Sequence, residues 1–540
     1  MRYHTLNIVA QSTQTHQEQK MSRKFLLGLL AVLVMTLLSA CVLPAPTSTS
    51  EPSSSAASSE DEQATGNRSV LRVPHFLVRG GAESLDPASP TEFSYANYLL
   101  YDRLVALDNS GVLVPELATA WTANEDATEW TFTLREGVTF HDGSAFDSAD
   151  VAYTFAHLLD PATESRAART LSLLVGTETP DPQTIIFQLE PGHADFPLLL
   201  SSRATAIVPA DSADTIATTG IGTGPFKLET FDPEGTTIFS ANDAYWQGAP
   251  ALAGVEMPAI ADSEARTLAL QAGQIDVLLQ ASPTAADLFM NSDDYTVLSF
   301  PTGTWIGLSM RIDMPPFDDA RVRQAIRLVT DRQAMVDLIL NGGGRVSCDT
   351  PVDPSDPYRW DPEGGCLQDI EGAKALLADA GYADGLDLTL YTSDVLPNLI
   401  PLAEIFQQQA AAAGINVALE ITPADSFFAE TAVNEAFITT GWLGRPTDEI
   451  LNLVFRSTSP LNEAKFQSAE FDQLLDDARQ TLDLAERTKL YQAAQQMLAT
   501  EGGHMIGMHI NEATIVSNAV SNFPARSVEH IEWYNISKSE

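Results

Sequence analysis

Hydrophobic and polar residues alternate along several segments of the chain and recur at helical spacing along others. Trp130, Phe132 and Leu134 alternate with polar residues, and residues 184–189 form a second β-rich run, so both segments are predicted strands. Residues 147–159, between them, carry a helical pattern. This part of the chain is therefore predicted to combine strands with a helix.

Further helical patterns occur in the second half of the chain. Asp318 can cap a helix whose apolar residues recur at i, i+3, i+4 and i+7, namely Val322, Ala325, Ile326 and Val329. Asn341-Gly342 is a typical helix end, so one helix is predicted between these signals. Residues 471–478 form another amphipathic pattern, and Asp483 and Glu486 form a capping box for a helix that follows.

A strand–helix–strand pattern lies between these helices. Leucines alternate over 386–390, Pro397 can open a helix that stops at Gly414, and apolar residues alternate again over 415–421. A helix that connects two strands in this way normally makes them parallel. The chain is therefore predicted to belong to the α/β class.

The N-terminal segment has the layout of an export signal. Arg23 and Lys24 precede an apolar run over 25–38, and small residues lead to Cys41. Leu38-Ser39-Ala40-Cys41 resembles the lipobox of bacterial lipoproteins, in which the cysteine becomes the lipid-bearing, palmitate-type N-terminus. The mature protein is therefore expected to begin at Cys41 and to be held at the cell membrane, on the periplasmic side or at the cell surface.

Two alternatives exist for the leader. A transmembrane anchor needs roughly 20 apolar residues, which is more than this run supplies, and a plain secretory signal would leave the cysteine unexplained. Translation can also start at Met21, because the polar residues 1–20 are unusual ahead of a signal. Residues 42–68 are rich in Ser, Thr, Pro, Ala and Glu and are predicted to be a disordered linker.

Length and charge narrow the class of protein. About 500 residues remain after the signal, which is more than one hydrophobic core usually organises, so two or three domains are expected. The 72 acidic residues outnumber the 30 basic ones and give a net charge of −42. Such a surface repels phosphate backbones, which excludes nucleic-acid binding.

Cys348 and Cys366 are the cysteines that remain after Cys41. They flank a segment rich in Pro, Asp and Gly, and outside the cytoplasm such a pair is expected to form a disulfide. Neither has a CxxC partner or a nearby histidine, which argues against a metal or redox role.

Motifs of catalysis are missing. The sequence has no GxSxG, HExxH or Walker lysine, and Gly222 to Lys227 has the wrong spacing for a phosphate loop. His504 and His509 are a tempting metal pair, but an odd separation puts them on opposite faces of a regular strand. His141-Asp142-Gly143 is predicted to be a turn. We therefore expect no enzyme activity, no cofactor and no metal site.

Several segments form a collinear set of motifs. In chain order they are PELA with Trp121, WTFTLREGVTFHDG (130–143), ADV (149–151), GTGPF (222–226), NDAYW (242–246), PPFDDARVRQAIRLVTDRQAM (315–335), AKALLADAGY (373–382) and AERTKLYQAAQQML (485–498). Together they resemble the family 5 extracellular solute-binding proteins, which are the oligopeptide, dipeptide and nickel binders of bacterial ABC importers. One motif would be weak, but the shared order is specific for the family.

The resemblance implies a two-lobed, periplasmic-binding-protein-like fold of type II with an extra subdomain in lobe I. The expected boundaries are a signal with lipobox over 1–40, a linker over 41–69, lobe I over 70–109, 220–304 and 502–540, the inserted subdomain over 110–219, and lobe II over 305–501. Two crossings between the lobes would form a hinge that closes on a solute.

The family's ligand segment suggests where the solute binds. In peptide-binding relatives a Trp- and Gly-containing segment is followed by an aspartate that pairs with the peptide amine; here Arg445 takes that position in residues 441–448. An arginine would repel an ammonium group and can grip a carboxylate. Asp448 or Glu449 can instead supply an anionic anchor, or pair with Arg445 and keep it from the ligand.

Other candidate ligand residues follow from the same resemblance. Arg311 stands where relatives often have asparagine and can face the cleft together with Arg445. Trp442 and Trp305 are candidates for aromatic packing against the solute, with Tyr98 and Tyr101 after them. Each aromatic residue can equally belong to the core.

The expected function is that of a lipid-anchored, monomeric receptor that captures a peptide-like or other small organic solute, one that can bear an acid group, and delivers it to membrane permease subunits. The alternatives are the same fold with an oligosaccharide or a metal chelate as ligand, or a secreted hydrolase. The missing catalytic motifs argue against the hydrolase.

Overall fold

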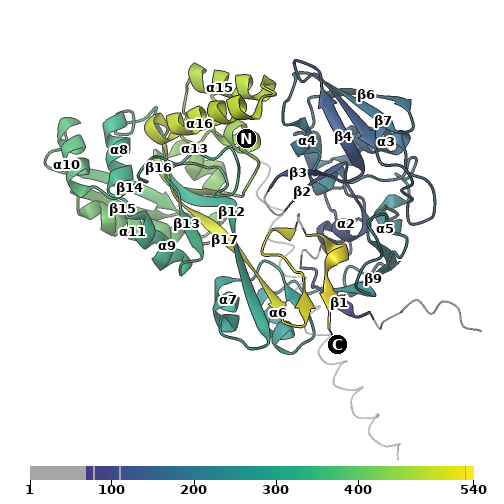
Figure 1. Ribbon diagram of the computed structural model, residues 1–540. Helices are drawn as coiled ribbons and strands as arrows, with labels where there is room; N and C mark the ends of the chain where they lie inside the picture. The colour runs from purple at the N-terminus through teal and green to yellow at the C-terminus, as the bar shows by residue number, and fades with distance from the viewer. Residues whose placement is uncertain (1–67, 77–78, 109–110, 529–530, 540) are drawn as a thin grey trace, which may run out of the picture. The chain divides into compact units, whose positions relative to one another are not determined.

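The computed structural model describes residues 68–540 apart from 77–78, 109–110, 529–530 and 540 (Figure 1). These residues belong to the compact unit that spans 65–540. The expected signal, the lipid-bearing Cys41 and most of the linker lie outside the described residues. Within the described part of the chain, no helix is both long enough and apolar enough to cross a bilayer.

An antiparallel sheet, which we call the β4–β7 sheet, forms in the region where strands were predicted. Its strands lie in the order β4-β5-β7-β6, with the bounds β4 (Ala118–Ala123), β5 (Glu129–Leu134), β6 (Leu174–Asp181) and β7 (Thr184–Leu189). Helix α3 (Ser148–Leu159) begins at Asp147 with a full capping box. Phe132, Phe155 and Phe187 pack between helix and sheet. The predicted strands and helix are confirmed.

A second sheet brings the two ends of the described chain together. Its strands lie in the order β1-β10-β9-β8, with the bounds β1 (Val70–Arg72), β8 (Phe226–Thr230), β9 (Thr236–Ala241) and β10 (Gly254–Pro258). The smaller neighbouring elements are α2 (Ser94–Leu100), β2 (Val105–Leu107), β3 (Leu113–Pro115), α4 (Phe196–Leu199), α5 (Ile216–Thr219), β18 (Val520–Ser521) and β19 (Ser537–Lys538). Lys538 donates to the carbonyl of Val70 at 3.0 Å, so the C-terminal segment returns to the first strand.

Gly222 and Gly224 lie directly against the backbone of Leu100. A Cβ at Gly224 would lie 2.5 Å from the carbonyl carbon of Leu100, and one at Gly222 would collide with its oxygen. The chain therefore crosses Leu100 so closely that neither position has room for a side chain. The predicted turn at 141–143 is also present, with Gly143 at φ +89°, and His141 Nε2 bonds to the carbonyl of Gly224 at 3.0 Å. Burial lowers the pKa of His141 to about 4.

The largest sheet is built around two long strands. β12 (Tyr295–Met310) and β17 (His504–Ser517) are antiparallel and run side by side in Figure 1. The strand order is β11-β17-β12-β16-β14-β15, with β11 (Val277–Leu278), β13 (Gly344–Val346), which pairs with β17, β14 (Leu386–Thr392), β15 (Ile415–Ile421) and β16 (Phe437–Trp442). The β12–β17 register shifts between Pro301 and Trp305, where the ladder is interrupted.

Helices cover both faces of this sheet. Adjacent residues of a strand point to opposite faces, and Ile306 and Leu308 pack with one set of helices while Trp305 packs with another. On the first face lie α8 (Ala320–Leu328), α9 (Arg332–Leu340), α10 (Ile370–Asp379) and α11 (Leu399–Ala411); on the second lie α14 (Thr447–Ile450), α15 (Ala469–Gln480) and α16 (Leu484–Glu501). Helices α6 (Ser263–Gln271) and α7 (Pro283–Phe289) lie near β11, and the short α12 (Ala424–Ser426) and α13 (Ala432–Asn434) precede β16.

The predicted strand–helix–strand unit is confirmed, since β14 and β15 are parallel and α11 connects them. The single helix predicted between Asp318 and Gly342 is wrong. The chain forms α8 and α9 instead, because Asp331 turns its side chain to the backbone N–H of Ala334 and starts a new helix. The cap of α8 is Asp319 rather than Asp318.

The prediction that His504 and His509 lie on opposite faces is also wrong. His504 is opposite Ser309 and His509 is opposite Trp305, four residues apart on β12 and therefore on one face. A register shift at Gly507 places an extra residue in β17 and changes the alternation. Each imidazole has its own surroundings, because His504 lies 3.6 Å from a Glu463 oxygen and His509 contacts Arg359.

Two buried arginines of α8 bind the end of α16. Arg323 donates to the carbonyls of Glu501 and Gly502, and Arg327 donates to those of Gly502 and His504. These groups carry the negative end of the helix dipole, which favours cations there. Arg323 and Arg327 therefore cap the end of α16, and the same contacts fix the start of β17.

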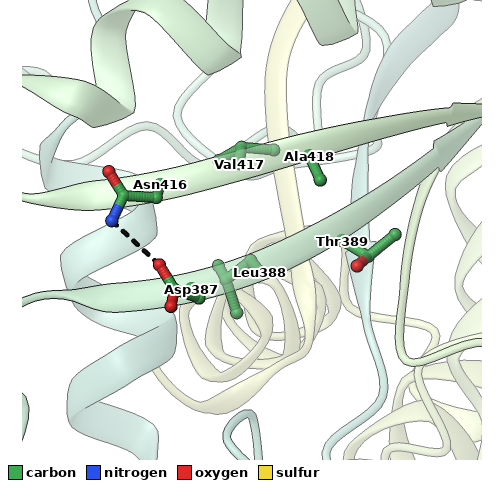
Figure 2. Close-up of a pocket in the computed structure, with 6 residues that line it drawn as sticks. All are labelled: Asp387, Leu388, Thr389, Asn416, Val417 and Ala418. Atoms are coloured by element: carbon green, nitrogen blue, oxygen red, sulfur yellow. Dashed lines mark hydrogen bonds between the residues drawn. The ribbon is translucent and has the colours of Figure 1, made fainter.

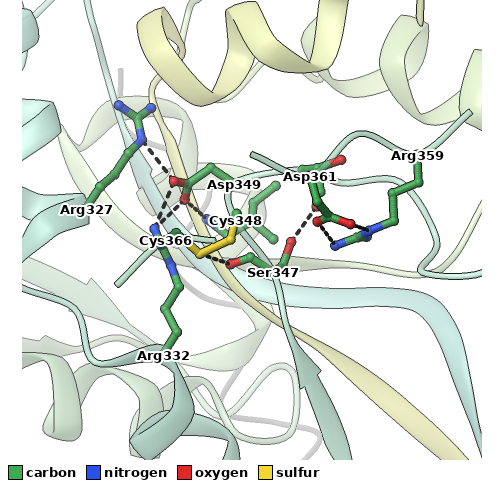
Figure 3. The surroundings of a disulfide bond; sticks show 10 residues. Arg327, Arg332, Ser347, Cys348, Asp349, Arg359, Asp361 and Cys366 are labelled. Carbon is green, nitrogen blue, oxygen red and sulfur yellow. Dashed lines mark hydrogen bonds and ion pairs between the residues drawn. A yellow bond between two sulfur atoms is a disulfide. The ribbon is translucent and has the colours of Figure 1, made fainter. Parts of the chain in front are cut away.

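Cys348 and Cys366 form a disulfide with a Cα–Cα distance of 5.5 Å (Figure 3). The closed segment is held to the sheet next to the bond. Asp349 accepts two hydrogen bonds from Arg332, at 2.9 and 2.8 Å, and one from the backbone N–H of Ile506 at 3.0 Å. Residues 348–366 therefore form a loop fixed at its start to β17, and we call it the disulfide loop.

Replacing both cysteines, as Cys348→Ala with Cys366→Ala, is expected to lower the free energy of unfolding by about 3 kcal/mol, because the unfolded loop gains conformational freedom. Urea denaturation followed by tryptophan fluorescence measures the change. Wild-type protein treated with a reductant is the control and should lose the same amount. Equal stability of the oxidised wild type and the double variant would contradict the prediction.

Candidate functional site

Two tryptophans lie directly opposite each other on neighbouring strands. Trp305 of β12 is paired with Trp442 at the end of β16, and His509 of β17 is paired with Trp305 from the other side. Side chains at paired positions share one face of the sheet, so the three rings form a row across three strands. Trp305 is fully buried, while Trp442 is partly buried at the end of its strand.

The chain passes closely over this row just beyond the two tryptophans. Gly303 and Gly444 touch, since a Cβ on Gly303 would lie 2.9 Å from the Cα of Gly444. The hydroxyl of Thr304 accepts a hydrogen bond from the backbone N–H of Gly444 at 3.2 Å. The segment that carries Arg445 is thereby held against the interrupted part of β12.

Three N–H donors in this neighbourhood have no partner among the residues that the structure describes. They are Nε1 of Trp305, Nε1 of Trp442 and Nε of Arg445, and all three atoms are buried. A buried donor without an acceptor is costly, so native proteins rarely keep one without a reason. The arrangement suits a ligand that supplies acceptor oxygens.

Arg445 contacts an acid of the following helix. Its Nη1 donates to Glu449 one helical turn further on, in the first turn of α14. This pairing is one of the alternatives considered for Arg445. It leaves Nε unused, and the side chain is about one-third exposed.

Asp448 lies in a different environment from Arg445. Arg479 donates to both carboxylate oxygens at 2.8 Å, and the Tyr491 hydroxyl donates to one of them at 3.1 Å. Burial alone would raise the pKa of Asp448, but the hydrogen bonds from His193 and Arg479 outweigh it and hold the pKa below its ordinary value. Asp448 is therefore an ionised carboxylate that is already saturated with donors.

The remaining candidate residues do not gather around the tryptophans. Arg311 follows the end of β12 away from Trp305, pairs with Asp313 at 2.7 Å and donates to the carbonyl of Val433. The β12–β16 pairing runs from Trp305 to Met310, a length of five residues or roughly 17 Å. Arg445 lies beyond one end of this pairing and Arg311 beyond the other. The structure does not bring Arg311 and Arg445 together.

The two tyrosine candidates lie on or after α2. The Tyr101 hydroxyl donates to the carbonyl of Leu85 at 2.8 Å, and burial raises its pKa further above the ordinary value. Tyr98 packs partly buried against the same hydrophobic cluster. Tyr101 is therefore a core residue.

Sequence reasoning missed a group of polar residues from distant segments. His193 and Asp195 follow the β4–β7 sheet, yet their side chains contact Asp448, Tyr358 and Arg487. No local pattern announces such contacts, because 255 positions separate His193 from Asp448. The one available signal in the sequence was the composition. With 72 acidic and 30 basic residues, some carboxylates can be expected to form buried ion pairs with arginines.

Two open hollows in the described part of the structure lie away from the tryptophans. One, of about 400 Å³, lies over β14 and β15, where Asn416 already donates to Asp387 at 2.8 Å (Figure 2). The other, also about 400 Å³, contains Asp86 and His157, which bond to each other at 2.8 Å. In the described ranges no cluster of three or more His, Cys, Asp or Glu side chains could hold a metal ion.

Comparison with known proteins identifies the class. The family described as bacterial extracellular solute-binding proteins, family 5, middle part, matches residues 112–460, which is more than half of the chain. The chain belongs to this family. It is an extracytoplasmic substrate-binding protein of an ABC importer, and its curated relatives are binding proteins rather than enzymes.

Individual relatives agree with this assignment. The chain is 28% identical over 455 residues to heme-binding protein A of Haemophilus influenzae, covering 75% of this chain and 80% of the relative. It is 28% identical over 437 residues to the glutathione-binding protein GsiB of Escherichia coli K12, covering 77% and 85%. The structure of HbpA2 from Haemophilus parasuis has the same fold, with a TM-score of 0.80, 24% identity, and coverage of 88% and 100%.

Replacing Asp448 by asparagine is expected to lower the free energy of unfolding at pH 7 by about 3 kcal/mol, because Arg479 loses its ionised partner in a buried setting. The folded pKa of Asp448 lies below its ordinary value of 3.8, so its contribution is present above that value and is lost as the pH falls through the folded pKa. The difference between wild type and Asp448→Asn should therefore shrink below about pH 4. Urea denaturation at pH 7 and pH 3 measures it.

Asp361→Asn is the matched control, since Asp361 also pairs with an arginine but is more than half exposed. The free energy of unfolding of Asp361→Asn should fall by less than about 1 kcal/mol. A loss at Asp448 that is equally small, or that does not depend on pH, would contradict the prediction.

Proposed function

We propose that this protein captures a small organic solute bearing an acid group, on a site built from Trp442, Trp305 and Arg445, and delivers it to the permease of its importer. The lipid on Cys41 holds the receptor at the membrane in this proposal. The protein works as a monomer and carries out no reaction on the solute.

The unused buried donors are the observation that supports an acidic solute. Two indole N–H groups and a guanidinium N–H can only donate hydrogen bonds. A carboxylate is their natural complement, because hydrogen bonds to ionised acceptors are about twice as strong as neutral ones. An amine would bring further donors and a positive charge toward Arg445.

The relatives are compatible with this chemistry. Those reported above are named for the binding of heme and of glutathione, and both compounds carry carboxylates. Arg445 would have to share its guanidinium between Glu449 and the solute, which its planar fork of donors allows. The partly buried ring of Trp442, with Trp305 beside it in the sheet, would then pack against the apolar part of the solute.

Closure around the solute requires a place where the chain bends. The interruption of the β12–β17 ladder between Pro301 and Trp305 adjoins the proposed site, and hinges commonly use a few such residues. Binding from both sides would then favour the closed state.

Arg445→Gln is expected to weaken binding of an acidic solute by about 10- to 100-fold, because the charge-assisted hydrogen bond is lost, and to leave a neutral ester nearly unaffected. Native mass spectrometry of freshly purified protein first reveals any retained solute. Quenching of tryptophan fluorescence by N-acetylglutathione and by its dimethyl ester then supplies a matched acid and neutral ester pair.

Arg321→Gln is the control, since Arg321 is an exposed arginine paired with Asp319 on α8. It should bind both forms as the wild type does. Equal affinity for the acid and the ester in wild type and in Arg445→Gln would overturn the proposal of an acidic solute.

A further inference from the structure

The segment His193–Asp195 connects β7 to α4. It contacts the helices on the second face of the largest sheet, the face covered by α14, α15 and α16. Asp195 accepts a hydrogen bond from the Tyr358 hydroxyl at 2.8 Å and pairs with Arg487 of α16 at 3.0 Å. The backbone N–H of Ala194 donates to the carbonyl of Arg479 at the end of α15. The β4–β7 sheet is thus joined to α15 and α16 by directional bonds.

The two ring nitrogens of His193 complete the contact. The backbone N–H of Asp195 donates to His193 Nδ1 at 3.1 Å, so in a neutral imidazole the ring proton lies on Nε2. His193 Nε2 faces Asp448 Oδ2 at 3.3 Å and donates to it. Trp130 of β5 holds the histidine backbone, because its indole N–H donates to the carbonyl of His193 at 3.1 Å.

The side chains of this contact are buried, and its carboxylates and its arginine carry charge. His193, Asp195, Asp448 and Arg487 are each less than one-tenth exposed. Burial raises the pKa of Asp195, and the cation of Arg487 opposes that effect. A carboxylate held in this way depends on its partner, because a lone buried charge is strongly unfavourable.

The partner side of the contact is itself rigid. Tyr358 belongs to the disulfide loop, and Gln495 of α16 donates to its carbonyl at 2.7 Å. The same glutamine accepts from the Thr350 hydroxyl at 2.6 Å, which ties the start of the loop to the helix. Arg487 donates to the Tyr358 hydroxyl at 2.7 Å, and the same hydroxyl donates to Asp195. The two hydrogen bonds form a chain and strengthen each other.

From these contacts we infer that Asp195, Tyr358 and Arg487, together with the His193–Asp448 hydrogen bond, form a latch that holds the β4–β7 sheet against α15 and α16 when the protein is closed. The inference rests on the proposed closure and gives the β4–β7 sheet a role in it. The latch residues are positioning residues: they set the population of the closed state, and hence the apparent affinity, without touching the solute.

The test compares inter-spin distances in ligand-free protein. Nitroxide labels are placed at Val175→Cys on β6 and Leu338→Cys on α9, which are 61% and 68% exposed, in a Cys41→Ser background. The wild type should show a short-distance component. Asp195→Asn should reduce its fraction at least about fivefold, because one partner of a desolvated ion pair is lost.

Tyr358→Phe is the second variant, since it keeps the ring in the core and removes only the hydroxyl; it should reduce the same component. Asp476→Asn is the matched control. Both carboxylate oxygens of Asp476 accept hydrogen bonds from Arg456 at 2.7 Å, and this pair is not part of the latch. It should leave the distances unchanged. Circular dichroism confirms that each variant is folded.

A wild-type distribution without a short component would overturn the latch, and so would variants that retain it. The measurement uses no solute. A protein that binds no acidic solute would therefore contradict the proposed function and leave the latch result standing.

Discussion

The antiparallel pairing of β12 with β17 is the interaction on which the rest of the structure depends. One half of this ladder continues into β16 and carries Trp305, and the other half continues into β11. The ladder is interrupted only a few residues before Trp305. Hydrogen-bonded strands resist sliding but can bend where pairing lapses, so the two halves stay in register while their angle changes. The proposed solute site adjoins that interruption.

Some buried N–H groups of the described structure have acceptors and others do not. Arg323 and Arg327 are buried near the end of α16, and both donate to free carbonyls there. Near the interruption of β12, by contrast, Trp442 and Arg445 keep buried N–H groups without acceptors in the described structure. A missing partner alone does not mark a ligand site, because Nη1 of Arg327 is also buried without an acceptor in the described structure. Trp442 and Arg445 differ from Arg327 in that their side chains are partly exposed, so the proposed solute can reach them.

Local patterns predicted most of the regular elements. Residues 184–189 and 415–421 are strands with the expected bounds, because strict alternation leaves little freedom of register. Two predictions failed where one residue changes the local geometry: Asp331 starts a new helix, and Gly507 adds a residue to β17. The site was only partly predictable. Trp442 and Arg445 follow from the family segment, whereas Asp195 and Arg487 meet through tertiary packing that no single-chain pattern encodes.

The latch contains the ion pair between Asp195 and Arg487, and an ion pair suits a contact that opens and closes repeatedly. An apolar interface of the same size would expose hydrocarbon on opening and would favour the closed state permanently. Opening here separates Asp195 from Arg487, and each ion then regains water, which offsets much of the lost attraction. Asp448 keeps Arg479 on its own side, so no unpaired buried charge remains there. In a chain with 72 acidic and 30 basic residues, placing two arginines at this contact makes closure specific and reversible at the same time.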